Sequence, residues 1–160
     1  MNVKDIMSQD VVCCTSDTPI QEVAQMMVDR DCGAIPVVDD IDSRRVLGVV
    51  TDRDITTRIV AQGFDVLEKT AADCMSSPVH TLPLEATLEE AERSLQEHQV
   101  RRLLVIDSSN GACCGILAQA DIARYAPTSE TAETVKRVSQ PSPTIDQRVR
   151  GESGGDLDIR

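Results

Sequence analysis

The sequence predicts a mixed α/β fold built from two copies of a β-α-β-β-α unit. Near the start of each copy, residues 4–8 align with residues 72–76, and at the end residues 48–55 align with 115–122. Short apolar runs alternate with amphipathic stretches inside each copy, as strands and helices require. A three-stranded sheet with two helices on one face leaves its other apolar face uncovered. We therefore expect the two repeats to be pseudo-symmetric and to pack through their sheets.

Local signals place the elements of each copy. Apolar residues at i, i+3 and i+7 predict an amphipathic helix, whose start is marked by Thr18-Pro19 with Gln21 in the first copy. Thr87 with Glu90 forms the corresponding capping-box pattern in the second. In the first copy we expect a helical turn, a strand, a helix, two strands and a closing helix at 3–7, 11–14, 19–31, 34–38, 46–51 and 52–62. Their counterparts are expected at 71–75, 79–82, 88–99, 102–106, 113–118 and 119–126.

These elements divide the chain into a first repeat at 1–67 and a second repeat at 68–126. Beyond them, residues 127–138 are expected to form one short terminal helix. Residues 139–160 are rich in Ser, Pro, Gly, Asp and Arg, and such a composition buries too little apolar area to order itself. We expect a flexible tail there, with a partner-binding peptide as the alternative.

Composition and charge exclude several classes of function. The formal net charge is −11, which repels nucleic acid and anionic membranes. Phe64 and Tyr125 are the only Phe, Tyr or Trp residues, so exposed bases would find no aromatic platform to stack on. The N-terminal stretch has an early acid and no apolar signal region, and no apolar run is long enough to span a bilayer. We expect a cytoplasmic protein that binds neither nucleic acid nor membrane.

Six cysteines raise the question of a metal or redox site. They form no Cys-x-x-Cys motif, and His80 and His98 stand alone, so we expect no metal and mostly buried, reduced thiols. A thiol-based redox regulator using the vicinal pairs Cys13-Cys14 and Cys113-Cys114 is the alternative. Adjacent residues on a strand point to opposite faces, so each pair has at most one outward thiol. No flanking Lys or His is present to lower the pKa of these thiols.

The strand-to-helix corner at 48–55, Gly-Val-Val-Thr-Asp-Arg-Asp-Ile, is the main candidate for ligand binding. The first N–H groups of a helix lack internal partners and favour anions, so Thr51 and the backbone near Asp52 suit a phosphate. The two carboxylate oxygens of Asp54 suit the vicinal hydroxyls of a ribose. A solvated acid that complements the helix dipole is the alternative for Asp54. Arg53 fits a ligand contact and a solvated surface position equally well.

A second candidate is the segment Cys32-Gly33-Ala34-Ile35-Pro36, which leads into the second predicted strand of the first copy. Gly33 permits unusual backbone angles, and Pro36 holds Ile35 extended. Main-chain groups of Gly33 and Ala34 can then pair with a purine edge while Ile35 packs on its face. Simple turn geometry is the alternative explanation for Pro36.

The duplicated unit resembles the CBS domain family over roughly residues 1–126, as a tandem pair. The resemblance rests on Asp-Ile-Met near the start, Gly-Ala-Ile-Pro-Val-Val-Asp at 33–39, and the specific Gly-x-x-Thr-x-x-Asp-Ile signature at 48–55. It implies a Bateman module, which binds AMP, ADP, ATP or a related adenosyl ligand in the cleft between its repeats. The family's threonine faces the phosphate or ribose and its aspartate holds the ribose hydroxyls, roles that fall on Thr51 and Asp54. It also implies a homodimer.

The second copy departs from this pattern. Ala118 stands where the threonine hydroxyl should be, and Leu104 stands where the first copy has Pro36, although Asp121 is retained. A site with the ribose clamp and without the hydroxyl should be weaker or should take a less phosphorylated ligand. We therefore expect one full site in the first copy and a degraded site in the second.

Arg102 aligns with Ala34, so its guanidinium could reach across the cleft to a phosphate, with a surface pair to Glu97 as an equal alternative. No nucleophile–base pair or metal triad can be assembled from the sequence, so we do not expect an enzyme. The leading hypothesis is a non-catalytic sensor of adenine nucleotides that acts on an unknown regulated protein and has no other cofactor. A structural or interaction dimer with an empty cleft is the second hypothesis, and the thiol regulator is the third.

Overall fold

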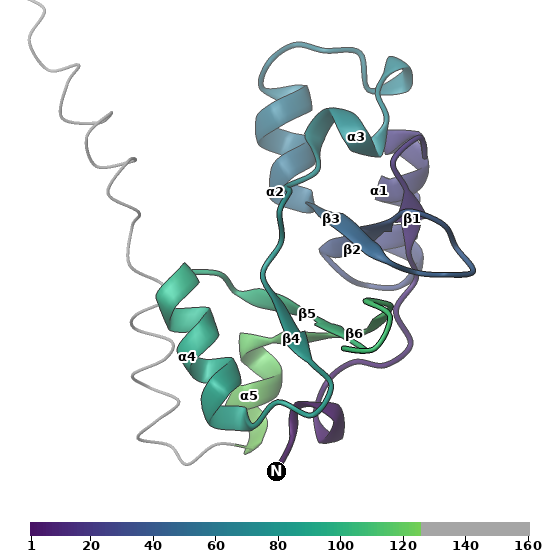
Figure 1. Ribbon diagram of the computed structural model, residues 1–160. Coiled ribbons are helices and arrows are strands. Elements are labelled where there is room, and N and C mark those ends of the chain that lie inside the picture. Colours follow the sequence, from purple (N-terminus) through teal and green to yellow (C-terminus); the bar gives the residue numbers. More distant parts are fainter. Residues whose placement is uncertain (126–160) are drawn as a thin grey trace, which may run out of the picture.

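Residues 1–125, the part of the chain that the computed structural model describes, form two lobes (Figure 1). Each lobe contains a three-stranded sheet and its helices, which confirms the predicted mixed α/β fold of two repeats. The terminal helix and tail expected at 127–138 and 139–160 lie outside the described residues, as does residue 126. Within the described part, every helix is too short or too polar to cross a bilayer.

The first lobe matches the sequence prediction at its two long strands and differs in its closing helix. The predicted helix at 52–62 is a single α-turn followed by wider turns, with Ala61 N–H donating to the Thr56 carbonyl five residues back. The Thr56 and Thr57 hydroxyls donate to carbonyls four residues back at 2.9 and 2.7 Å, a contact that competes with regular α-helical bonding. The elements are β1 (Cys14–Thr15), α1 (Ile20–Asp29), β2 (Ala34–Val38), β3 (Val46–Thr51), α2 (Asp52–Asp54), η2 (Ile55–Val60) and η3 (Val66–Glu68).

The second lobe repeats this order. Its long strands again have the predicted bounds, and its closing helix is a regular one that follows β6 directly. The elements are β4 (Thr81–Pro83), α4 (Leu88–His98), β5 (Arg102–Ile106), β6 (Cys113–Ala118) and α5 (Gln119–Tyr125).

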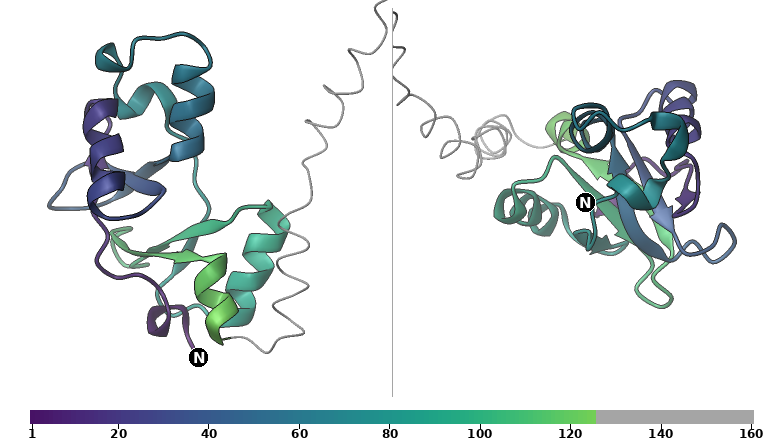
Figure 2. Two further views of the ribbon diagram at one scale, coloured as in Figure 1. Left: turned by 180° about the vertical axis from the view of Figure 1, so that it is seen from behind. Right: turned by 90° about the horizontal axis from the view of Figure 1, so that it is seen from above.

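The two sheets have the same topology. In the first, β2 lies between β1 and β3, parallel to β1 and antiparallel to β3. In the second, β5 takes the same position between β4 and β6. The register shifts at equivalent points, between Val37 and Val38 and between Val105 and Ile106. The sheets face each other across the middle of the molecule, with the helices on the outer sides (Figure 2).

One of the two predicted helix caps is present. Thr87 and Glu90 form the expected capping box, with Thr87 N–H donating to the Glu90 carboxylate at 2.8 Å. The prediction for the first repeat is wrong, because Pro19 is the N-cap of α1 and no side chain caps it. The Thr18 hydroxyl instead accepts a 3.0 Å bond from Thr15 N–H in the preceding turn, which removes it from the helix end.

Each repeat gives its N-terminal turn to the opposite lobe. The turn η1 (Val3–Asp5) contributes Val3 to the core of the second lobe, whereas α3 (Ala71–Cys74) contributes its buried residues to the core of the first. Ser8 exchanges two backbone hydrogen bonds of 2.9 and 3.0 Å with Ile116 of β6. Each lobe thus packs against the N-terminal turn of the other repeat, which the repeat pattern in the sequence does not reveal. The boundary between the repeats at 67/68 stays a prediction.

Two glycines permit this exchange. A Cβ added at Gly115 would lie 2.7 Å from the Ser8 carbonyl oxygen, and one added at Gly48 would lie 2.9 Å from that of Ser76. Ser76 pairs with Val49 of β3 in the same way that Ser8 pairs with β6. The glycine that opens each strand-to-helix corner therefore lets a backbone segment of the other repeat approach closely.

Candidate functional site

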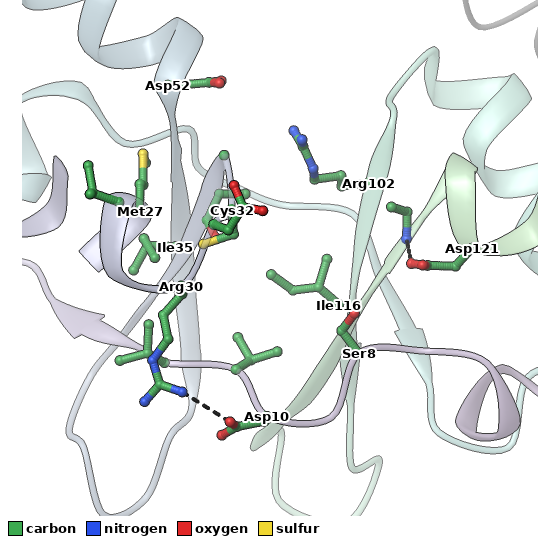
Figure 3. Close-up of a pocket in the computed structure, with 17 residues that line it drawn as sticks. Ser8, Asp10, Met27, Arg30, Cys32, Ile35, Asp52, Arg102, Ile116 and Asp121 are labelled. Carbon is green, nitrogen blue, oxygen red and sulfur yellow. Dashed lines mark hydrogen bonds and ion pairs between the residues drawn. The ribbon is translucent and has the colours of Figure 1, made fainter. Parts of the chain in front are cut away.

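A cavity of about 750 Å³ opens between the two lobes (Figure 3). Its volume lies within the range of about 300–1,000 Å³ that is typical of small-molecule sites. Both repeats contribute to its wall. The first repeat supplies the segment after η1, the end of α1 and the start of β2, and the second supplies β6 and the starts of β5 and α5.

The wall from the first lobe is the short segment between α1 and β2. Asp31 reverses the chain with a φ of +47°, and Cys32 N–H then donates to the Met27 carbonyl at 3.0 Å. A Cβ added at the next residue, Gly33, would lie 2.8 Å from an Asp52 carboxylate oxygen and 3.3 Å from Nη2 of Arg102. Gly33 therefore leaves room for an acid from its own lobe and a cation from the opposite lobe beside the same stretch of backbone.

The wall from the second lobe includes Asp121 at the start of α5. Its Oδ2 accepts a 2.8 Å bond from the Ala118 N–H, which orients the carboxylate at the cavity (Figure 3). Its Oδ1 has only a long contact of 4.0 Å with Nη1 of Arg124. One carboxylate oxygen of Asp121 is therefore available to a donor group in the cavity.

The charged side chains of the wall are two arginines and four aspartates. At the rim, Nη1 of Arg30 and Oδ2 of Asp10 form an ion pair at 3.0 Å (Figure 3). Arg102 forms no ion pair within residues 1–125, so the predicted alternative of a pair with Glu97 is not present. Arg102 is thus the unpaired cation of this wall, in a cavity whose overall charge is negative.

The structure brings together six of the ten residues that the sequence singled out. Those lining the cavity are Gly33, Ala34, Ile35, Asp52, Arg102 and Asp121, whereas Pro36, Thr51, Arg53 and Asp54 are not part of its lining. Of the two aspartates at the ends of the signatures, Asp54 and Asp121, the one that lines the cavity with the first-repeat segment is therefore Asp121 of the second repeat. This follows from the face-to-face packing of the lobes, which sets each corner opposite the other repeat. The binding roles of all ten residues stay predictions.

Asp54 lies in a different environment. It is 8% exposed, and its carboxylate accepts a 2.9 Å bond from Thr51 N–H, while Asp54 N–H donates to the Thr51 hydroxyl at 3.1 Å. The hydroxyl of Ser76 donates to the same carboxylate at 3.3 Å, and Nε of Arg58 lies 3.7 Å from it. Thr51 and Asp54 therefore form a capping box that also holds the exchanged segment of the second repeat.

The sequence reasoning missed the residues of the exchanged segment and of the α1 end. Ser8, Asp10, Val12 and Arg30 all line the cavity. The repeat alignment placed Ser8 opposite Ser76, which was a usable signal for paired positions. It did not indicate that either serine would lie against the other repeat, because that depends on the exchange of the N-terminal turns.

A CBS domain model matches the sequence twice, at residues 3–61 and 71–128. The chain belongs to the CBS domain family. Hypoxic response protein 1 of Mycobacterium tuberculosis is 35% identical over 138 residues, which cover 86% of this chain and 94% of that protein. The matches confirm the tandem CBS pair expected from the repeat.

Two solved structures show the same CBS architecture. The crystal structure of Hypoxic Response Protein I with two coordinated zinc ions has a TM-score of 0.69 at 34% identity, covering 79% of this chain and 100% of that chain. The crystal structure of CBSX2 in complex with AMP has a TM-score of 0.63 at 26% identity, covering 85% and 98% of the two chains.

In this CBS pair, no group of three or more His, Cys, Asp or Glu side chains among residues 1–125 is arranged to hold a metal ion. His80 and His98, which the sequence left isolated, stack with their ring centroids 3.6 Å apart. Partial burial and the neighbouring His98 ring lower the pKa of His80. The stacked imidazoles form a packing contact between α4 and the segment before β4.

Proposed function

We propose that this CBS pair is a non-catalytic regulatory module that senses an adenine nucleotide or a related adenosyl ligand in the cavity between its repeats. One observation carries the proposal: Asp121, Arg102 and the Gly33–Ile35 segment, drawn from both repeats, line a single cavity. Each has the chemistry that one part of a nucleotide requires. The AMP complex of the related CBSX2 supports the same ligand class.

The roles follow from the donor and acceptor groups. The free oxygen of Asp121 accepts from the ribose hydroxyls, and Arg102 pairs with a phosphate. Ile116 and Val12, which are partly exposed and line the cavity, supply apolar surface for the purine, whereas the Ile35 side chain is buried in the first lobe. The purine therefore lies between the lobes, with its ribose toward α5.

The charge of the wall indicates which nucleotide binds best. Two arginines face four aspartates, and one arginine is already paired with Asp10. Each added phosphate increases the repulsion from the remaining acids. AMP should therefore bind more tightly than ADP, and ADP more tightly than ATP. If repulsion from the acids outweighs the contact with Arg102, a neutral or cationic adenosyl compound should bind more tightly than any of the three.

The decisive experiment is isothermal titration calorimetry of AMP with Asp121→Ala and with Asp54→Ala as the matched control. Loss of one or two charge-assisted bonds, worth ~1.5–3 kcal/mol each, should weaken binding to Asp121→Ala at least about tenfold. Asp54→Ala should keep its affinity as long as circular dichroism shows it folded. If Asp54→Ala loses binding and Asp121→Ala does not, the site belongs to the other corner.

Arg102→Gln separates the phosphate contact from the nucleoside contacts. It should weaken AMP about five- to tenfold, in line with one surface-accessible charge-assisted bond, and leave adenosine unchanged. Equal losses for both compounds would contradict the phosphate role. If no adenosine compound shifts the thermal unfolding of the wild-type protein, the structural module is the better description.

We also propose that the module is a cytoplasmic homodimer acting on an unidentified protein. The described cysteines are all free thiols, which fits a reducing compartment. Val60, Phe64 and Leu67 are each more than half exposed on the first lobe, which fits a surface that is covered in an assembly. A monomer mass in light scattering would contradict the dimer, and cell fractionation tests the compartment.

A further inference from the structure

A small buried cluster joins the two lobes away from the sheet cores, and it contains one cysteine from each repeat. Cys13, just before β1, and Cys113, the first residue of β6, are 9% and 4% exposed and pack with Val38. Their side chains pack together in this cluster. The neighbouring cysteines differ, since Cys14 points into the core of the first lobe and Cys114 is directed at the Ala112 carbonyl 3.5 Å away.

Arg44 holds both members of this pair. Its Nη2 donates to the Cys13 sulfur at 3.3 Å and to the Val11 carbonyl at 2.7 Å, and its own carbonyl accepts from Cys113 N–H at 2.8 Å. The residue adopts a φ of +53°, an unfavourable conformation for a side chain of this size. No Lys or His flanks these cysteines in the sequence. The cation beside Cys13 is Arg44, which lies 31 residues away along the chain.

The charge of Arg44 is not neutralised within residues 1–125. None of the ion pairs there includes Arg44, and its Nε is buried without a hydrogen-bond partner. A cation held close to a sulfur and lacking a carboxylate partner favours the thiolate over the thiol. The sulfur of Cys13 is therefore the natural counter-ion of Arg44.

The Cys13 and Cys113 thiols differ in their pKa. The hydrogen bond from Cys113, together with Arg44, lowers the pKa of Cys13 to about 7 despite burial. The same hydrogen bond and burial raise the pKa of Cys113. Burial also raises the pKa of Cys14 to about 12 and that of Cys74 to about 11. Near neutral pH, Cys13 is thus partly a thiolate, while the other three remain protonated.

We propose that Cys13 and Cys113 form a redox site that closes a disulfide between the two repeats on reaction with a peroxide. The Cys13 thiolate attacks one peroxide oxygen, the O–O bond breaks, and Cys13 becomes a sulfenic acid with release of hydroxide or alkoxide. The Cys113 sulfur then displaces the sulfenic oxygen to form the S–S bond, and its proton leaves with that oxygen as water. Two thiols are oxidised, and the peroxide is reduced to water, or to water and an alcohol.

The position of the pair gives the reaction a consequence. The bond joins the start of β1 to the start of β6, which belong to different lobes. Val11 and Val12 precede Cys13 directly and line the cavity. Oxidation therefore fixes the wall of the cavity covalently to the opposite repeat and raises the melting temperature, whether or not the cavity binds an adenosyl ligand.

The test is peptide mapping of the full-length protein after brief treatment with hydrogen peroxide and alkylation of the remaining thiols. Tryptic peptides 5–30 and 103–124 each contain two cysteines and should appear linked, with the loss of two hydrogens. Cys13→Ala and Cys113→Ala should abolish the linked species, whereas the matched variants Cys14→Ala and Cys114→Ala should retain it. Linkage that survives Cys13→Ala, or a dimer on a non-reducing gel, would overturn the proposal.

A second measurement tests the role of Arg44. The alkylation rate of Cys13 by iodoacetamide should rise with pH through a midpoint near 7 in the wild-type protein. Arg44→Gln should slow the reaction about fivefold at neutral pH and leave it unchanged above pH 10, where the thiol is ionised in either protein. Arg44→Lys should restore most of the rate. Equal rates in wild type and Arg44→Gln at neutral pH would show that the cation does not activate the thiol.

Discussion

The two strand-to-helix corners have an aspartate at the equivalent position, and the two carboxylates lie in different surroundings. Asp54 is enclosed by Thr51, Ser76 and Arg58, so its carboxylate is satisfied within the protein. Asp121 has a single short bond, from Ala118 N–H, and lines the cavity. The first corner, which has both the threonine and the aspartate of the signature, is thus the one whose polar groups are already bonded within the protein. A signature read from sequence identifies the corner but does not tell which carboxylate is open to a ligand.

The largest expected difference between the corners is in folding stability. Asp54→Ala removes a buried acceptor with three partners, and we expect a loss of ~2–3 kcal/mol in the free energy of unfolding. Asp121→Ala removes one short bond at a half-buried site and should cost ~1 kcal/mol. Urea denaturation measures both. Equal losses would mean that the surroundings of the two aspartates do not matter for stability.

The glycines at the start of each corner offer a second comparison. Gly115→Ala and Gly48→Ala should each destabilise the protein by ~1–3 kcal/mol, because the new Cβ would lie 2.7 or 2.9 Å from a backbone oxygen of the exchanged segment. Only Gly115→Ala presses on Ser8, which lines the cavity.

Thermal unfolding and AMP titration of the two glycine variants should therefore diverge. Both should unfold at lower temperature, and Gly115→Ala alone should bind AMP more weakly. If both variants keep the affinity of the wild type, Ser8 has no part in the site.

The smallest expected effect comes from exchanging the capping hydroxyl between the corners. Thr51→Ala should cost ~1 kcal/mol, because Asp54 N–H loses its acceptor. Ala118→Thr supplies the missing hydroxyl to the second corner and should stabilise it by up to ~1 kcal/mol. The reciprocal changes are measured by chemical denaturation. A destabilised Ala118→Thr would indicate that the second corner cannot accommodate a capping box.

Much of the fold could be predicted because it depends on local pattern. The bounds of the strands at 34–38, 46–51, 102–106 and 113–118 are as expected, since apolar alternation and turn residues act over a few positions. The helix predicted at 52–62 is present from Asp52 to Val60, but it widens into a π-helix at its threonines, whose hydroxyls bond to the backbone. The cap at Thr18 failed because a neighbouring turn uses its hydroxyl. In the closing helix the threonine side chains compete for carbonyls of the helix itself, whereas at Thr18 the N–H of Thr15, outside the predicted helix, binds the hydroxyl.

The candidate site was less predictable than the fold. Gly33, Ala34 and Ile35 were correctly grouped as one segment, because they are adjacent in the chain. Their grouping with Asp121 in one cavity, in place of Asp54, was not foreseen. Ser8 was overlooked for the same reason, since its position beside the cavity depends on pairing with Ile116 of the other repeat.

The sequence by itself determined the repeat, the α/β class, the strands and the two strand-to-helix corners. These rest on periodicity, capping and turn chemistry, which act between residues close in the chain. Only the tertiary structure decided which residues of different repeats meet: Asp121 with Gly33, and Cys13 with Cys113 and Arg44. Those meetings follow from the exchange of N-terminal turns and the packing of one sheet on the other. Both are long-range contacts between surfaces that look alike in the sequence, so pattern alone could not assign them.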